Sequence, residues 1–318
     1  MDSQTDNPKP TGAVPFVDLH IHTFHSGDAQ YSPEEIFKFG AEVGLSGLAI
    51  TDHDSVAAIP KALELSAQTK IEFVPAIELT TDFEGRELHI LGYYIEPECP
   101  YLAQTLERLN RARFEQALER VALLRKLGFR ITYEEAAERQ HDATPSGTIL
   151  AAVILDKNEQ VRDPRVVPYI SGSRSGKPEL CFFQDYMGRG APAYVPRRWV
   201  PTPEAVEQLL RCGAVPVLAH PGAGVFSAGE RLITELKGAG LKGLEVFTSY
   251  HDEKASHYYL NLAKKLNLIP SAGSDFHGRI KPHVVFGSVR AVGPELISVL
   301  KSCRRAPERA PGNDPTHP

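Results

Sequence analysis

The sequence predicts an α/β protein, a distorted seven-stranded (β/α) barrel with an inserted, mainly helical subdomain. Seven short apolar runs alternate with amphipathic helical stretches, one long interval breaks the alternation, and His, Asp and Glu gather where the runs end. Because the runs are almost continuously apolar, they are typical of parallel strands that are buried on both faces. Seven such strands exceed what a small open sheet needs, which favours a closed or distorted barrel.

The expected strands are the apolar runs themselves. They are Phe16–Ile21, Gly47–Thr51, Ile71–Ile77, Leu88–Ile95, Ala214–Ala219, Gly243–Phe247 and Leu268–Ala272. Helices are expected between them, at Ser32–Val43, Val56–Ala67, Pro203–Arg211, Gly229–Leu236 and Asp252–Leu266. In the first helix, Ser32 is placed to cap the N-terminus and Pro33 takes the first helical position, where no N–H is needed.

The interval 101–201 interrupts this alternation and predicts the inserted helical subdomain. It opens with a long charged helix at Tyr101–Leu127, in which arginines are interleaved with glutamates, so a solvated face with ion pairs is expected. The barrel then comprises residues 15–100 and 202–302. Residues 1–14 and 303–318 are rich in proline and charge and are expected to be flexible ends.

Composition excludes several classes of function. The 318 residues carry a net charge of −5, so no overall basic field would recruit nucleic acid or an anionic membrane. No apolar run reaches the roughly 20 residues of a membrane-spanning helix, and the polar N-terminus lacks the apolar core of a secretory signal, which favours the cytoplasm. The four cysteines are scattered without CxxC spacing and give no support for a disulfide framework or a thiolate zinc site.

Histidines and acids cluster where the expected strands end. His20 and His22 are two residues apart, so on a strand both project to one face and could hold the same metal ion. Further candidates in ITDHDS, AIELT, ELHILGYY, VLAHPG and GSDFHG are His53, Glu78, His89, His220, Asp275 and His277. A single histidine is usually just a hydrogen-bonded residue, and Asp52 and Asp54 could simply cap the following helix. Because barrel strands end at one mouth, however, the joint pattern predicts a metal site, and imidazole with carboxylate suits Zn, Mn or Fe.

Together these motifs resemble the PHP (polymerase and histidinol phosphatase) superfamily, whose motifs match DLHIHT, ITDHDS, AIELT, LHILGYY, LAHPG and GSDFHG in order over roughly residues 15–290. The resemblance implies the PHP fold, a distorted seven-stranded barrel that holds two to three divalent metal ions. It implies a first metal on His20, His22, Glu78 and Asp275, a second on Glu78, His89 and His220, and a third on Asp28, His53 and His277. The usual motif is HTxxSDG, whereas this chain has HTFHSGD, so either Asp28, through a shifted loop, or His25 completes the third site.

The long insertion, the GYY after His89 and the run from AYVPRRWVP to LAHPG are similar to the stand-alone branch of this superfamily, which includes nucleoside 3′,5′-bisphosphate phosphatases and 5′-to-3′ exoribonucleases. This implies a metal-dependent phosphoesterase that acts through a metal-bound hydroxide on a small phosphorylated substrate, either a nucleotide or the 5′ end of short RNA. No membrane and no protein partner is implied. Two alternatives stay open: a histidinol-phosphate phosphatase, against which the long insertion argues, and a metal-binding PHP module without turnover.

Four further residues are candidates for acid catalysis or contacts to phosphate. Arg279 and Lys281 follow GSDFHG closely, Arg197 precedes Trp199, and His251 lies after the sixth strand. Surface charge or an ordinary loop histidine is the competing interpretation for each. Glu245 is expected to face inward and orient a metal ligand. The chain has neither a GxSxG nucleophile elbow nor a GxxxxGK[ST] loop, so neither a covalent serine nucleophile nor an NTP-binding P-loop is predicted.

Overall fold

The computed structural model describes residues 15–139, 144–160, 163–196, 198–223 and 227–308. Of the ends expected to be flexible, residues 1–14 and 309–318 lie outside these residues, whereas residues 303–308 lie within them, and the Glu308 amide donates to the Arg211 carbonyl at 2.8 Å. In spatial order the sheet runs β1 (Phe16–Ile21), β2 (Leu45–Ile50), β3 (Glu72–Phe83), β4 (Arg86–Tyr93), β6 (Val215–Leu218), β7 (Gly243–Thr248) and β8 (Ile269–Gly273), with the short β5 (Val200–Pro201) paired to β3. All seven expected strands are present and form a nearly closed barrel, which confirms the predicted fold class.

The barrel closes where β8 meets β1. The Asp275 amide donates to the His20 carbonyl at 2.8 Å, and the His22 amide donates to the Phe276 carbonyl at 3.0 Å. A Cβ on Gly273 would lie 2.2 Å from the Cβ of His20, so only glycine permits this approach. The closure therefore brings two of the sequence motifs side by side.

One strand runs opposite to the expected direction. The apolar runs predict an all-parallel sheet, but β3 and β4 form an antiparallel hairpin, and β4 is also antiparallel to β6. The hairpin turns at Glu84 and Gly85, whose φ angles are 52° and 77°. The reversal places His89, near the start of β4, opposite Thr80 and therefore at the same barrel mouth as the ends of the parallel strands.

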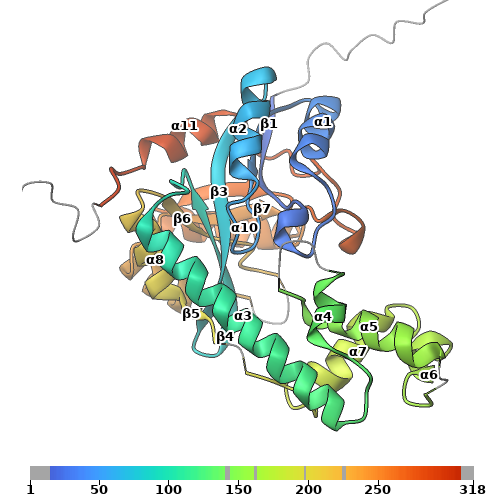
Figure 1. The fold of residues 1–318 in the computed structure, drawn as a ribbon. Helices are drawn as coiled ribbons and strands as arrows, with labels where there is room; N and C mark the ends of the chain where they lie inside the picture. Colours follow the sequence, from blue (N-terminus) through green and yellow to red (C-terminus); the bar gives the residue numbers. More distant parts are fainter. Residues whose placement is uncertain (1–14, 140–143, 161–162, 197, 224–226, 309–318) are drawn as a thin grey trace, which may run out of the picture.

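Helices cover the outside of the barrel (Figure 1). They are α1 (Pro33–Val43), α2 (Ile59–Gln68), α8 (Thr202–Arg211), α9 (Glu230–Gly238), α10 (Glu253–Leu266) and α11 (Glu295–Ser302), the last of which was not expected. Ser32 and Glu35 form a capping box at the start of α1, as the sequence suggests. Within the described residues, no helix combines the length and the apolar character that crossing a bilayer requires.

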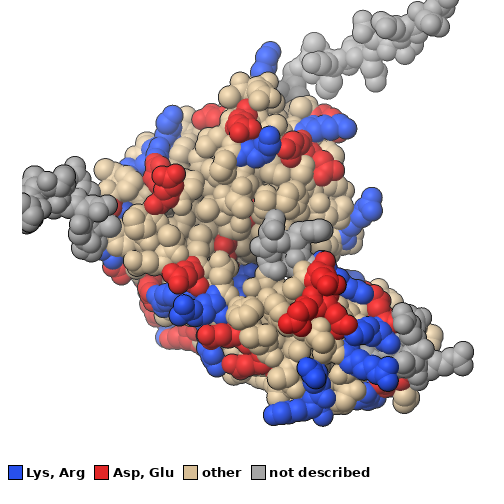
Figure 2. Space-filling view, in the orientation of Figure 1, with Lys and Arg blue, Asp and Glu red and all other residues tan. Residues whose placement is uncertain are grey.

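The interval between β4 and β5 is helical. Its helices are α3 (Pro100–Lys126), α4 (Tyr133–Ala137), α5 (Gly147–Gln160), α6 (Val167–Ile170) and α7 (Pro178–Met187). The first half of α3 packs Leu102 and Leu109 into the barrel's apolar cluster, whereas Val121 and Leu124 join a separate apolar cluster built by α4–α7. Helix α3 thus links the barrel to the other four helices, which lie to one side of it (Figure 1). Basic and acidic side chains are mixed over this side of the molecule (Figure 2).

A disulfide closes the stretch of chain that contains this helical insertion, β5 and α8. Cys99, just before α3, is bonded to Cys212, just after α8, and both are buried. The scattered cysteines give no reason to expect such a bond, because residues 113 positions apart are brought together only by the tertiary fold. The expectation that the cysteines form no disulfides is therefore wrong for this pair.

Candidate metal centre

Glu78 lies at the middle of the predicted metal site. It is fully buried on β3, and both of its carboxylate oxygens face histidine rings. Oε2 lies 3.3 Å from His20 Nε2, 3.2 Å from His22 Nε2 and 3.1 Å from His53 Nδ1, and Oε1 lies 3.0 Å from His89 Nδ1 and 3.2 Å from His220 Nε2. One carboxylate thus joins five imidazoles that come from four strands or the loops that follow them.

Asp275 forms the second carboxylate of the cluster. Its Oδ1 lies 3.2 Å from His20 Nε2 and 3.0 Å from His22 Nε2. Its Oδ2 accepts hydrogen bonds from the Tyr250 hydroxyl at 2.5 Å and from Lys281 Nζ at 2.8 Å. The backbone of Asp275 has a φ of 58°, a conformation that is costly for a non-glycine residue and is often found at functional sites.

Asp28 lies beside the remaining pair of histidines. Its Oδ2 is 3.6 Å from His53 Nε2 and 3.5 Å from His277 Nε2. The short helix Phe24–Ser26 ends on Gly27 with a φ of 80°, and this left-handed turn directs Asp28 towards the cluster. In the described residues, the groups of potential ligand atoms include Asp28 and not His25.

The charge and hydrogen bonding of these atoms fit divalent cations. Their ligand atoms fall into groups that share residues: His20, His22, Glu78 and Asp275; His22, Asp28, His53 and His277; and His53, Glu78 and His89. Many of the atoms that face inward are buried and have no hydrogen-bond partner: His20 Nε2, His22 Nε2, His53 Nδ1, Glu78 Oε2, Asp275 Oδ1 and His277 Nε2. Buried polar atoms without partners cost free energy, and coordination of a cation would satisfy all of them at once.

The opposite ring nitrogens are held in place by protein atoms. His20 Nδ1 donates to Glu245 Oε1 at 2.9 Å, His22 Nδ1 pairs with Ser26 Oγ at 2.7 Å, and His277 Nδ1 donates to the Asp275 carbonyl at 2.9 Å. This leaves the Nε2 atom of each ring directed into the cluster. Glu245 also accepts from the His220 amide at 2.7 Å, so it orients two segments of the site in the position that the sequence suggests.

Titration behaviour reflects the excess of negative charge. Burial opposes a charged His20, but the carboxylates of Glu245, Glu78 and Asp275 raise its pKa well above the usual value. Burial likewise opposes ionised Glu78 and Asp275, yet the surrounding histidines, and Lys281 beside Asp275, hold both pKa values well below normal. The cluster is therefore an anionic site that favours bound positive charge.

The four predicted acid or phosphate contacts have different environments. Lys281 lies at the cluster and donates a hydrogen bond to Asp275, whereas the side chain of Arg279 is exposed. Arg197 lies outside the described residues. Both ring nitrogens of His251 are hydrogen-bonded within the protein: Nδ1 donates to the Val246 carbonyl at 2.8 Å, and Nε2 accepts from the Gly222 amide at 2.9 Å. Burial lowers its pKa, which agrees with a neutral ring that holds two loops together.

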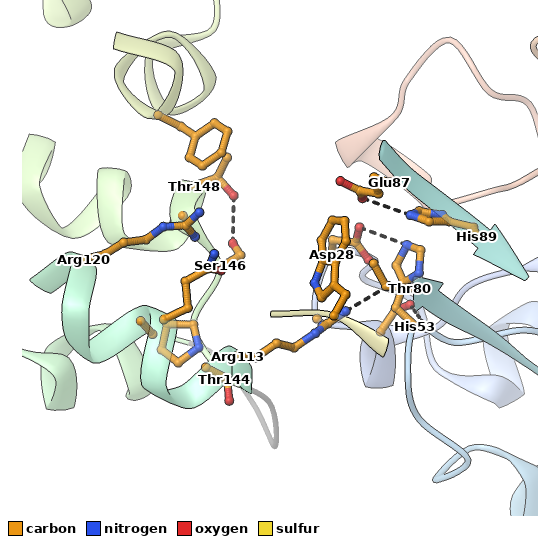
Figure 3. A pocket seen from close by; sticks show the side chains of 18 residues that line it. Asp28, His53, Thr80, Glu87, His89, Arg113, Arg120, Thr144, Ser146 and Thr148 are labelled. Carbon is orange, nitrogen blue, oxygen red and sulfur yellow. Dashed lines mark hydrogen bonds and ion pairs between the residues drawn. The ribbon is translucent and has the colours of Figure 1, made fainter. Parts of the chain in front are cut away.

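A cavity of about 260 Å³ separates the cluster from the helical insertion. Figure 3 shows Asp28, His53 and His89 on one side, Arg120, Ser146 and Thr148 on the other, and Arg113 reaching across. A second cavity of about 510 Å³ lies against His89, His220, Tyr250 and Lys281. Both cavities border on His89, so the cluster is reached from two sides.

The sequence did not predict that an arginine of α3 reaches the barrel beside the metal cluster. Arg108 and Arg111 pair with glutamates at the surface, as expected, but Arg113 forms an ion pair with buried Asp54 and donates to Thr80 Oγ1 at 3.1 Å. Asp54 does not cap a helix, because its Oδ1 accepts from the Thr80 amide at 2.8 Å and its own amide donates to the Glu78 carbonyl. One feature of the sequence could have revealed Arg113: Asp54 directly follows the candidate ligand His53, and no basic residue close to Asp54 in sequence could pair with it.

Comparisons with known proteins agree with this geometry. The PHP domain family matches residues 18–159. The chain is 30% identical over 275 residues to the 5′-3′ exoribonuclease Rnm of Escherichia coli (strain K12), an alignment that covers 84% of this chain and 87% of that protein. The chain belongs to the PHP family. It is a hydrolase of phosphoester bonds.

Other relatives of this PHP protein support the same assignment. It is 28% identical over 265 residues to a 3′,5′-nucleoside bisphosphate phosphatase of Chromobacterium violaceum, covering 82% of this chain and 87% of that protein. A solved Chromobacterium violaceum amidohydrolase with bound sulfate has a TM-score of 0.71 at 28% identity, covering 92% of this chain and 98% of that one. A Bifidobacterium adolescentis structure has a TM-score of 0.76 at 22% identity, covering 92% and 97%, and shows the shared fold.

Proposed function

We propose that this PHP protein hydrolyses phosphate esters of nucleotides, using divalent cations held by the histidine and carboxylate cluster. The substrate would be a nucleoside 3′,5′-bisphosphate or the 5′ end of a short RNA, in the cytoplasm. The observation that carries the proposal is the convergence of five imidazoles on Glu78, with inward-facing atoms that have no hydrogen-bond partner. The exoribonuclease and bisphosphate phosphatase relatives support the nucleotide class.

Three cations of the Mn, Zn or Fe type fit the donors. His20, His22, Glu78 and Asp275 would hold the first; Glu78, His89 and His220 the second; and Asp28, His53 and His277 the third. Bound divalent cations supply acidified water and a clamp for phosphate oxygens. Glu78 falls in two of the three groups of ligand atoms, so its loss would disturb both the first and the second site.

The residues around the ligands have defined tasks in this proposal. Glu245 fixes the ring of His20, so that its Nε2 points into the cluster. Tyr250 and Lys281 hold Asp275 Oδ2, which leaves Oδ1 facing His20 and His22. Lys281 also borders the larger cavity, where its ammonium group would attract a substrate phosphate.

Metal replacement and a substrate panel test the proposal directly. The purified protein is analysed for bound metal, stripped with EDTA and reloaded with Mn, Zn or Fe. Phosphate release is then measured with adenosine 3′,5′-bisphosphate and histidinol phosphate, and nucleotide release with a 5′-phosphorylated oligoribonucleotide. We expect EDTA to abolish activity, one metal to restore it, and a nucleotide substrate to be preferred over histidinol phosphate by at least about tenfold in kcat/KM.

Two results would contradict the proposal. One is full activity of protein shown by elemental analysis to be free of metal. The other is a preference for histidinol phosphate, which would favour the alternative phosphatase assignment.

A further inference from the structure

Asp52 is a buried carboxylate to which the proposed function assigns no task. It follows β2, is only 1% exposed and belongs to none of the groups of potential metal ligands. Capping of the following helix, the role that the sequence suggests, is not observed: α2 begins at Ile59, and its cap residue Ala58 makes no side-chain hydrogen bond. A buried carboxylate costs free energy unless its oxygens are hydrogen-bonded, so the partners of Asp52 indicate its role.

Both oxygens of Asp52 are bonded to Thr23, which follows β1. Oδ1 accepts from the Thr23 amide at 2.6 Å, and Oδ2 accepts from the Thr23 hydroxyl at 2.7 Å. Thr23 is fully buried. Its hydroxyl also accepts from the His25 amide at 3.3 Å and thereby caps the short helix Phe24–Ser26. Asp52 thus fixes the start of the loop that leads to Asp28.

The rest of this loop contacts two candidate ligands directly. Ser26 Oγ accepts from the His53 amide at 2.8 Å and pairs with His22 Nδ1 at 2.7 Å. Asp28 follows two residues later, with Oδ2 3.6 Å from His53 Nε2 (Figure 3). His22, His53 and Asp28 belong, with His277, to one group of potential ligand atoms. The place of the loop therefore decides whether this group can form.

The backbone of Asp52 is anchored beside the central carboxylate. Its carbonyl accepts from the Glu78 amide at 3.3 Å, and the next residue, His53, forms a bridge with Glu78 on β3. The main chain of Asp52 is thus tied to β3, whereas its side chain holds the loop that follows β1. One residue therefore sets the distance between this loop and Glu78, and it does so without any cation.

We propose that Asp52 is a positioning residue for the third cation, because through Thr23 it fixes the loop that carries Asp28. This inference rests on the proposed function, in which a third cation is bound beside the first two. Both oxygens of Asp52 are engaged by Thr23, so Asp52 orients ligands and is not itself a ligand. Residues that orient metal ligands typically change metal affinity by about 10- to 100-fold when they are replaced.

The first cation should depend much less on Asp52. Its ligands are oriented from other parts of the barrel: Glu245 holds the ring of His20, and Tyr250 and Lys281 hold Asp275 Oδ2. A loss confined to the last cation to bind is therefore expected, whereas general damage to the barrel would weaken all of them.

Thr23→Val and Asp52→Ala remove the contact, and Thr23→Ser keeps the hydroxyl and should restore it. Thr51→Val is the matched control, because Thr51 is equally buried but its hydroxyl donates to the Ile21 carbonyl at 3.2 Å. EDTA-stripped protein is dialysed against graded Mn, and bound Mn is counted by elemental analysis. Thr23→Val and Asp52→Ala should need about 10- to 100-fold more free Mn for the third equivalent. Wild type, Thr23→Ser and Thr51→Val should agree within about twofold.

Hydrogen exchange of metal-free protein reports on the loop without cation or activity. The His25 and Ser26 amides are bonded to the hydroxyl and the carbonyl of Thr23. A peptide that contains residues 23–30 should exchange at least about tenfold faster in Thr23→Val and Asp52→Ala than in the wild type, because the loop opens more often. Thr23→Ser and Thr51→Val should exchange at the wild-type rate.

Several results would overturn the positioning role. They are wild-type affinity for the third Mn in Asp52→Ala, an unchanged exchange rate of the loop, faster exchange over all peptides alike, or a Thr23→Ser variant as impaired as Thr23→Val. A wild type that binds only two cations would also overturn it, and nucleotide hydrolysis by that protein would leave the nucleotide activity standing. If the wild type binds three cations but hydrolyses no nucleotide, the proposed function fails, and the Mn and exchange measurements still decide the role of Asp52.

Discussion

The two walls of the smaller cavity carry opposite charge. The barrel wall presents buried carboxylates and imidazoles around Glu78, whereas the insertion wall presents Arg120 and the start of α5. The barrel wall has unpaired atoms suited to cations, and the insertion wall has an unpaired cation suited to an anion. In our proposal the barrel wall performs hydrolysis, so substitutions there should affect every phosphoester substrate alike.

The largest effect is expected on the barrel wall. His20→Ala and Asp275→Asn each remove one metal ligand from the group formed by His20, His22, Glu78 and Asp275. Hydrolysis of every phosphoester should therefore fall by about a thousandfold or more. Phosphate release, elemental analysis and circular dichroism together check activity, metal content and fold. Full activity of both purified variants would disprove the metal centre.

A smaller effect is expected where the walls are joined. Arg113→Met leaves the buried carboxylate of Asp54 without its partner, which should destabilise the fold by about 3 kcal/mol, the lower end of the range for a broken buried pair. Asp54 is hydrogen-bonded to the backbone of Glu78 and Thr80 and so helps to position Glu78. Nucleotide hydrolysis should therefore also fall by about tenfold. Melting temperatures and kcat/KM check this, with Arg111→Met as the control.

The same variant has a defined pH dependence. Burial already raises the pKa of Asp54 and Arg113 opposes this rise, so removing Arg113 should raise the pKa in the folded state further. The folded variant then binds a proton more readily than the unfolded chain, and its stability deficit relative to the wild type should shrink as the pH falls from about 8 to 5. A deficit that stays constant over this range would show that Asp54 is not the cause.

The smallest effect is expected from Tyr250→Phe. The substitution removes one of two hydrogen bonds to Asp275 Oδ2, and Lys281 still holds that oxygen. We expect kcat to fall about 2- to 10-fold with unchanged metal content, because Lys281 keeps Asp275 Oδ2 in place when one hydrogen bond to it is lost. A loss as large as that of Asp275→Asn would mean that Tyr250 acts directly on substrate.

The barrel wall was predictable because its residues follow the pleat of short strands. His20 and His22 share a face by spacing alone, and the parallel strands end at the same mouth. The reversal of β4 was not predictable, because an apolar run such as the one containing His89 has no direction of its own. The sequence left open whether Asp28 or His25 lies at the third group of ligands. Only the structure shows that the backbone turns at Gly27 and brings Asp28 to His53 and His277.

The insertion wall was not predictable, because the burial of a helical residue depends on its partners. Arg111 and Arg120 occupy the same charged helix, yet one is largely exposed and the other lies under α5 and Phe183. Nothing local distinguishes them. Arg113 likewise gains its role only because the tertiary fold places α3 against Asp54, 59 positions away in sequence.

The bond between Cys99 and Cys212 closes residues 99–212, which comprise the helical insertion, β5 and α8, into a covalent ring. A protease that cuts once between these cysteines would open the ring without releasing a fragment, and both halves would stay attached to the barrel. Reducing agent would then be needed to part the two pieces on a denaturing gel. The lobe that carries Arg120 is thus retained even when its own backbone is severed.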